Sequence, residues 1–408
     1  MNGPDRPRRI AVVGAFDTKG DELAFLAAAV REAGAEVTTV DCGVLGDSPG
    51  HRVDVPAAAV AEAGGSSLAR LSADGDRAAA VAVMGAGATR ILEGSVGAGR
   101  IHGFIAAGGS NAAAIATHVC GHLPFGVPKV IVSTMVAENT STLVGGRDVV
   151  LFYPVADIEG LNHVSRSVLR RAGAAVAAMV STPPDAVGRP RSLVAATASG
   201  TTTGCVGAAR AGVEAAGAEM LVFHANGQGG RSYEDLLADG VVSACVDLSL
   251  TEITDEVAGG QFPAGPTRLG GAVRAGVPQV VAPGGADMVK FGPPDTVPAR
   301  FRDRRIHPHN AHVTLVRADA DESWTVGETI GRRLREGPGA VVLALPLGGV
   351  SALDVPGGVF EDPDADAALF AGLRAAAADL RIIESPHHLN DPEFGELLVR
   401  LLGEIHQL

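Results

Sequence analysis

RIAVVG at residues 9–14 and SLVAAT at residues 192–197 decide the fold, because each opens a strand–turn–helix unit that the chain uses twice. Each apolar run leads into a Thr-bearing turn, an expected helix and the tetrapeptide AGAE, at 33–36 and again at 216–219. Alternating strands and helices are typical of parallel sheets covered on both faces. The sequence therefore predicts an α/β chain of two doubly wound, mainly parallel-sheet (Rossmann-like) domains facing a cleft.

A second echo and the chain length set the domain limits. GVPKV at 126–130 is repeated as GVPQV at 276–280, at the same stage of the strand–helix alternation. A chain of 408 residues exceeds what one hydrophobic core usually supports. Clustered Pro, Gly and charge then mark a linker between two periodic stretches. We expect an N-terminal domain at 1–181, a linker at 182–191 and a C-terminal domain at 192–408.

Two segments depart from this regular alternation. The first half is longer between its echoes than the second, and residues 42–100 are the expected place for the additional chain. Residues 283–311 show little periodicity and are expected to form a long loop.

Composition narrows the class of function. The formal net charge of -13 argues against a general nucleic-acid binder, which presents basic surface to phosphates. The N-terminal apolar run is too short for a signal peptide or a membrane span, so we expect a cytoplasmic protein without membrane contact. The four cysteines lack metal-ligand spacing and are expected to be reduced, buried thiols.

The first candidate binding element is the turn GAFDTKG at 14–20. Turns between a strand and a helix hold phosphates in doubly wound folds, through free N–H groups and the positive end of the helix dipole. Lys19 would neutralise a phosphate, Thr18 would donate a hydroxyl, and Asp17 would hold a cation or a ribose. The alternative is a plain helix start, with Asp17 or Thr18 as cap and Glu22 closing a capping box.

Two further strand ends of the first half carry small residues and hydroxyl groups. We expect the Gly-Gly-Ser turn to lie beside the Asp-Thr-Lys turn, so that both grip one negatively charged ligand. The candidate cofactor-binding residues here are Gly108, Gly109, Ser110, Asn111, Ser133 and Thr134.

The second half offers a parallel set at its own strand ends. His224, Glu252 and His388 are the candidate acid–base residues. His307 and His309 can share a side around Pro308, but no carboxylate or cysteine accompanies them at ligand spacing, so we expect no metal site. The candidate substrate-binding residues, which are alternatively turn formers and caps, are Thr201, Thr202, Thr203, Gly227, Gly229, Gly230, Gly284, Gly285 and Ser351.

With these residues laid out, the chain resembles the ATP-binding family typified by the N-terminal region of the tomato mosaic virus resistance protein of tomato. The similar stretches run in order along almost the whole chain and include GAFDTKGDELAFL (14–26), AAGGSNAAAIAT (106–117), DIEGLNHVS (157–165) and DLSLTEITDEVAGG (247–260). The resemblance implies two doubly wound domains, ATP binding with Mg²⁺, and a homodimer. Relatives usually continue the glycine loop with further glycines where this chain has Asn111-Ala112-Ala113, which makes a smaller or different ligand an alternative.

Three functions remain in competition. The first is a nucleotide-dependent enzyme that acts on a small metabolite, with phosphates held in the first domain and proton transfer in the second. The second is a nucleotide-free hydrolase or lyase on a small acyl or carboxylated substrate, although no GxSxG elbow is present. The third is a binding or regulatory protein without turnover.

Overall fold

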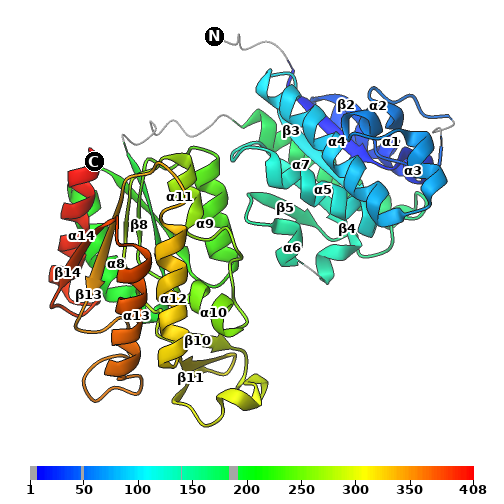
Figure 1. Cartoon of the computed structure of the whole chain (residues 1–408). Helices are drawn as coiled ribbons and strands as arrows, with labels where there is room; N and C mark the ends of the chain where they lie inside the picture. Colours follow the sequence, from blue (N-terminus) through cyan, green and yellow to red (C-terminus); the bar gives the residue numbers. More distant parts are fainter. Residues whose placement is uncertain (1–6, 47–49, 139, 183–191) are drawn as a thin grey trace. The chain divides into compact units, whose positions relative to one another are not determined.

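The chain forms two compact units in a computed structural model that describes residues 7–46, 50–138, 140–182 and 192–408. The units span Met1–Val187 and Gly188–Leu408 (Figure 1). Apart from Thr182, the predicted linker lies outside the described residues. The predicted cleft shared by the two domains stays a prediction.

The first unit is built on one parallel sheet. The strand order is β2-β1-β3-β4-β5, and every neighbouring pair is parallel. The interior strands are mainly apolar because helices cover both of their faces. The strands are β1 (Arg9–Gly14), β2 (Glu36–Asp41), β3 (Gly103–Gly108), β4 (Lys129–Ser133) and β5 (Val149–Phe152).

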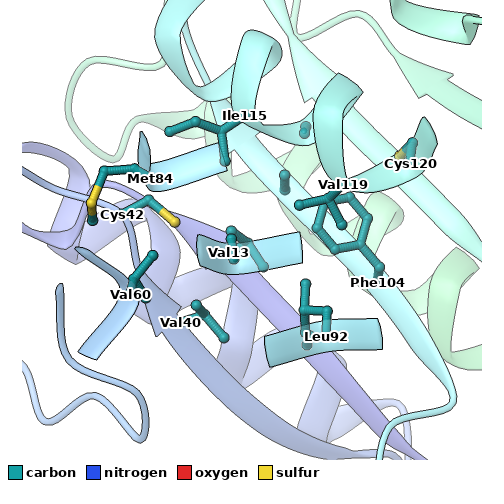
Figure 2. Packing of buried hydrophobic residues seen from close by; sticks show 14 of the residues in the cluster. Val13, Val40, Cys42, Val60, Met84, Leu92, Phe104, Ile115, Val119 and Cys120 are labelled. Atoms are coloured by element: carbon teal, nitrogen blue, oxygen red, sulfur yellow. The ribbon is translucent and has the colours of Figure 1, made fainter. Parts of the chain in front are cut away.

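Helices cover this sheet on two faces. Helices α1 (Phe16–Glu32) and α7 (His163–Ser181) pack on the face that carries Ile10 and Val12. The opposite face carries Val13 and Val40, which contact Met84, Ile115 and Val119 from the helices above them (Figure 2). The helices of this second face are α2 (Ala57–Ala63), α4 (Arg77–Gly97) and α5 (Ser110–His122), with α3 (Leu68–Asp74) beside them and the short α6 (Thr140–Val144) after β4.

The second unit repeats the same plan with one more strand. Its parallel sheet has the order β14-β13-β9-β8-β6-β7. Helices α8 (Thr203–Ala215) and α14 (Pro392–Ile405) cover one face. The other face is covered by α9 (Gln228–Ala238), α10 (Thr251–Ala258), α11 (Gly270–Ala275), α12 (Ala320–Arg333) and α13 (Pro363–Ala376). The strands are β6 (Leu193–Ala198), β7 (Glu219–His224), β8 (Ala244–Asp247), β9 (Gln279–Val281), β13 (Val341–Pro346) and β14 (Arg381–Ser385).

The prediction of a long loop at 283–311 is wrong. This segment contains β10 (Met288–Phe291) and β11 (Ile306–Asn310), which pair antiparallel with β12 (Val313–Arg317), and the short η3 (Pro294–Thr296) and η4 (Ala299–Phe301) lie between them. Strands of four or five residues among Pro and Gly show no clear period, and their pairing depends on β12. His307 and His309 therefore lie on an edge strand.

The echoes in the sequence mark equivalent positions in the two sheets. GVPKV runs into β4 and GVPQV runs into β9. In the first sheet β4 lies beside β3, and in the second sheet β9 lies beside β8, which holds the equivalent place. The prediction for residues 42–100 is confirmed, since α2, α3 and α4 lie between β2 and β3, whereas α9 lies between β7 and β8. In the described part of the chain, no helix combines the length and apolarity that a membrane span requires.

Candidate functional site

A cavity of the first unit lies at the carboxyl ends of β1 and β3. After β1 the chain passes to one face of the sheet, and after β3 it passes to the other. The place between two such strands is the topological switch point, where doubly wound sheets bind ligands. The cavity has a volume of about 530 Å³ and a largely apolar wall that includes Leu71, Met84 and Ile115. Its polar lining comes from Asp17, Thr18, Ser72, Asp76, Arg77 and Asn111.

Asp41 organises the turn after β1. The carboxylate of this buried strand-end residue accepts hydrogen bonds from the N–H of Phe16 at 3.0 Å and of Gly43 at 2.8 Å. The first of these N–H groups opens α1, so a fixed negative charge already occupies the positive end of that helix. A phosphate at the same place would meet like charge. The sequence analysis did not single out Asp41, although an acid that ends a strand beside the first turn is a signal that could have found it.

Asp17 lines the cavity with an incompletely used carboxylate. Its Oδ2 accepts a hydrogen bond from the N–H of Leu45 at 2.8 Å. Its Oδ1 is buried and has no hydrogen-bond partner among the residues that the structure describes. A side chain at position 43 would lie 2.4 Å from the Asp17 carboxyl carbon, so Gly43 leaves room for this carboxylate. The site thus offers an acceptor to a ligand hydroxyl or amine.

Helix α4 and helix α5 bring positive elements to the cavity through Arg77 and the start of α5. Helix α5 begins after Gly109 without a side-chain cap within the described chain, which leaves N–H groups at its start. With its amide oxygen turned toward Arg77, Asn111 accepts hydrogen bonds from the guanidinium at 2.8 and 3.1 Å. Gly108 has φ +152, and a side chain there would lie 2.6 Å from the Ala112 Cβ. The turns after β1 and β3 lie side by side, as predicted, since these strands pair and Asp17, Thr18 and Asn111 line the same cavity. Their joint binding of an anion stays a prediction, and an anion fits the α5 side better than the α1 side.

Lys19 does not line this cavity. Its ammonium forms an ion pair with Glu159, and the nearby Glu22 accepts a hydrogen bond from the N–H of Gly160 at 2.6 Å. Both side chains therefore fasten the start of α1 to the segment that precedes α7. Lys19 also has non-helical backbone angles, so the helix is kinked at this residue.

The remaining predicted residues of the first unit lie apart from Asp17. Ser110 lines a second, mainly apolar cavity of about 330 Å³ that also includes Met135 and Leu143. Ser133 is buried, and its hydroxyl accepts a hydrogen bond from the N–H of Met135 at 3.3 Å. Thr134 opens the short 3-10 helix that follows β4. The predicted set is thus divided between two sides of α5.

In the second unit, Glu252 belongs to a buried network of charges. Its Oε1 accepts hydrogen bonds from the N–H groups of Gly227 at 2.6 Å and Gly230 at 3.0 Å, and its Oε2 accepts one from Arg268 Nε at 2.8 Å. The Arg268 guanidinium also makes a bidentate pair with Asp247, at 2.5 and 2.8 Å. Both oxygens of Glu252 are engaged, an arrangement that suits a structural anchor.

Two opposing effects, burial and the charges of neighbouring side chains, set the pKa values in this network. Burial alone lowers the pKa of Arg268, but the carboxylates of Asp247, Glu252 and Glu234 raise it well above its usual value. Burial raises the pKa of Glu234, against the pull of Arg268. The guanidinium therefore stays charged and holds three acidic side chains together. Nothing in the local sequence singles out Arg268, which lies in an irregular segment before α11.

The two predicted histidines lie in different surroundings. His224 ends the edge strand β7 and is exposed. A neutral His388 ring protonated on Nε2 donates to the carbonyl of Ser351 at 2.9 Å and accepts from the N–H of Asn390 at 3.0 Å. These contacts do not join His388 to Glu252, so no contact described here unites the predicted acid–base residues.

The predicted glycines and hydroxyl residues of the second unit are set in close packing. A side chain at Gly229 would lie 1.8 Å from the His224 carbonyl oxygen, and one at Gly284 would lie 2.1 Å from that of Leu248. Ser351 donates a hydrogen bond to Asp287 Oδ2 at 2.7 Å. Thr201 and Thr202 are buried at the turn after β6, whereas Thr203 is exposed.

The cysteines are buried, as predicted. Burial raises the pKa of the Cys205 thiol to about 12, and it raises the pKa of Cys42, beside the first cavity, even more. Thiolate chemistry is therefore disfavoured at both residues.

Comparison with known proteins places the chain in a family. Residues 8–185 match the model described as "Uncharacterised protein family (UPF0261) N-terminal domain", and residues 191–406 match the corresponding C-terminal domain. A UPF0261 protein of Clostridium tetani is 38% identical over 97% of this chain and 98% of its own length. The ToMV resistance protein Tm-1(GCR237) of Solanum lycopersicum is 34% identical over 97% of this chain, which corresponds to 56% of the tomato protein.

Similarity to solved structures is low. UDP-N-acetylglucosamine 2-epimerase from Rickettsia bellii aligns with a TM-score of 0.24 and 10% identity, over 63% of this chain and 78% of the epimerase. A TM-score this low carries no argument about site or ligand. The two domain matches and the full-length relatives are sufficient, and the chain belongs to the uncharacterised protein family UPF0261, in both its N-terminal and its C-terminal domain.

Proposed function

We propose that the first unit binds a nucleotide in the 530 Å³ cavity and that the chain is a nucleotide-dependent enzyme acting on a small metabolite. The observation that carries the proposal is Asp17 Oδ1 at the switch point of the sheet, which has no hydrogen-bond partner among the described residues. A carboxylate that accepts hydrogen bonds from ribose hydroxyls is a recurrent feature of nucleotide sites at such switch points.

The proposal includes an orientation for the ligand. The ribose contacts Asp17, and the base packs against the apolar wall formed by Leu71, Met84 and Ile115. The phosphate faces the start of α5, where Arg77 is held by Asn111. This orientation differs from the phosphate grip by Thr18 and Lys19 that the sequence predicts, because Asp41 already neutralises the start of α1.

ATP with Mg²⁺ remains within this proposal. The start of α5 and Arg77 would take the phosphates, and bound Mg²⁺ would screen their charge. We assign the metabolite to the second doubly wound unit, whose strand ends carry hydroxyl groups. Separate places for the nucleotide and the metabolite support an enzyme over a protein that only binds a nucleotide.

Isothermal titration of the full chain with ATP, ADP, AMP and adenosine, each with and without Mg²⁺, tests the proposal. We expect binding that Asp17→Asn weakens about tenfold or more, the cost of a lost hydrogen bond to a charged group. Glu32→Gln is the matched control, because Glu32 lies at the far end of the same helix, is 64% exposed and pairs only loosely with Arg170 at 3.8 Å. It should leave binding unchanged.

The phosphate assignment has its own test. Arg77→Gln should weaken AMP more than adenosine, since only AMP carries the anion. Absence of binding by all four compounds, or equal effects of Asp17→Asn and Glu32→Gln, would overturn the proposal. Binding of small acyl or carboxylated compounds in their place would favour the nucleotide-free hydrolase or lyase.

A further inference from the structure

Positive charge is scarce at the nucleotide cavity of the first unit. Among the described residues, its charged lining side chains are Asp17, Asp76 and Arg77, so the lining holds two carboxylates and one guanidinium. A terminal phosphate carries about 1.5–2 negative charges at pH 7, and each further phosphate in a chain adds to this charge. The cavity therefore has one cation for all the phosphates of a ligand.

The cavity also lacks a lysine, the residue that binds the outer phosphates of a triphosphate in many nucleotide sites. The first unit contains two lysines, Lys19 and Lys129. The Lys19 ammonium pairs with Glu159. The Lys129 ammonium donates to two backbone carbonyls at 2.7 and 3.0 Å and to Asp148 Oδ1 at 2.7 Å, which uses its three donors. Within the described chain, neither lysine lines the cavity.

The donors that do line the cavity match one phosphate. The Arg77 guanidinium has five N–H groups, and the Asn111 amide oxygen accepts two of them, at 2.8 and 3.1 Å. In the described chain this leaves three N–H groups for a ligand, and a terminal phosphate has three free oxygens. Asn111 and Ala112 line the cavity as well, and their N–H groups belong to the uncapped start of α5. A single phosphate at this place satisfies both the guanidinium and the helix start.

A longer phosphate chain would meet a fixed carboxylate and a closed turn. Asp76 precedes Arg77 at the start of α4, where its Oδ1 accepts a hydrogen bond from the N–H of Ala79 at 3.0 Å and is held in place. At the start of α5, the Ala112 Cβ lies only 2.6 Å from the Cβ position of Gly108, so this part of the turn is already filled. Like charge and lack of space both act against further phosphates.

We propose that the cavity selects a nucleoside monophosphate over the corresponding triphosphate, which rests on the nucleotide site proposed above. The phosphate binds Arg77 and the start of α5, the ribose binds Asp17, and Asp76 repels a longer phosphate chain. Mg²⁺ reduces the charge of ATP but does not shorten this chain. A monophosphate has no phosphoanhydride bond, so the nucleotide serves as a substrate, product or activator and not as a phosphoryl donor.

Isothermal titration of the full chain with AMP, ADP and ATP, each with and without Mg²⁺, measures the selection. We expect AMP to bind about tenfold more tightly than ATP in both conditions, with ADP between them. A higher salt concentration should reduce this ratio, because screening weakens the repulsion between exposed charges.

Asp76→Asn tests the repulsion directly. Asparagine also caps helices, so the start of α4 is retained. The variant should raise the affinity for ATP about threefold and the affinity for AMP by less, because only ATP brings further phosphates to this carboxylate. The matched control is Asp74→Asn, since Asp74 on α3 is 59% exposed, pairs with Arg70 at 3.5 Å and lies outside the described cavity lining. It should change neither affinity.

The selection and the nucleotide site fail in different ways. Tighter binding of AMP than of ATP, together with an effect of Asp76→Asn that Asp74→Asn lacks, supports the selection. ATP that binds as tightly as AMP, with or without Mg²⁺, overturns the selection while the nucleotide site stands, and so do equal effects of the two aspartate variants. Absence of binding by all three nucleotides overturns the site and the selection together.

Discussion

Replacement of Glu252 by Gln separates a structural role from a catalytic one. The carboxylate accepts three hydrogen bonds, from Gly227, Gly230 and Arg268, at 2.6, 3.0 and 2.8 Å. A glutamine side chain has one acceptor oxygen and one NH₂ donor group. If the oxygen faces the two glycines, the NH₂ group meets the Arg268 donor, and the opposite orientation loses both glycine contacts. Either way, at least one charge-assisted hydrogen bond becomes a contact between two donors.

The magnitude follows from the burial of the site. Glu252 is 0% exposed, so water cannot replace the lost partner. A hydrogen bond to a charged group contributes about 1.5–3 kcal/mol, and an unsatisfied buried donor adds a penalty of about 1–3 kcal/mol. We therefore expect Glu252→Gln to lower the free energy of unfolding of the second unit by about 3 kcal/mol or more.

The assay uses a natural probe. Trp324 on α12 is the single tryptophan of the chain, so its fluorescence during urea unfolding reports the second unit alone. The control is Glu404→Gln, in which a half-exposed carboxylate loses its 2.6 Å pair with Arg381. A surface pair contributes about 1 kcal/mol or less. If the two variants unfold at the same urea concentration, the structural reasoning is wrong and Glu252 regains its place as the predicted base.

Three further predictions concern single groups. Burial raises the pKa of Asp255 to about 7 and the pKa of Asp287 to about 6, above the usual 3.8. The folded chain therefore holds these protons more tightly than the unfolded chain, and the stability that they contribute at low pH is lost as the pH rises from about 4 to 7. Urea unfolding across this range should show a loss on the order of 3 kcal/mol per carboxyl group, and Asp287→Asn should flatten the curve. Gly108→Ala should reduce the yield of folded first unit, measured by circular dichroism, because φ +152 and the 2.6 Å approach to Ala112 exclude a side chain, whereas Gly97→Ala, with open space around it, should not. Lys19→Gln should leave nucleotide affinity within about threefold in calorimetry, since its ammonium pairs with Glu159 outside the cavity, and a loss as large as that of Asp17→Asn would restore the predicted phosphate grip.

The fold class, two doubly wound units with mainly parallel sheets, follows from the sequence alone. Apolar runs such as RIAVVG are buried on both faces, and that pattern alone specifies an interior parallel strand. The repeated GVPKV and GVPQV segments marked equivalent strands because both units use the same local solution. The closeness of the turns after β1 and β3 followed as well, since parallel neighbours end at the same edge of a sheet.

Which polar groups are free and which are already engaged becomes visible only in the folded chain. Glu252 and Lys19 look like reactive residues in the sequence, yet Arg268 lies 16 positions from the former and Glu159 lies 140 positions from the latter. Within the described ranges, Asp17 Oδ1 and Ser249 Oγ find no hydrogen-bond partner, whereas the carboxylate of Asp41 is held by two backbone N–H groups. Hydrogen bonds and ion pairs act over a few ångströms in space, so partners from distant parts of the chain have no signature in the local sequence.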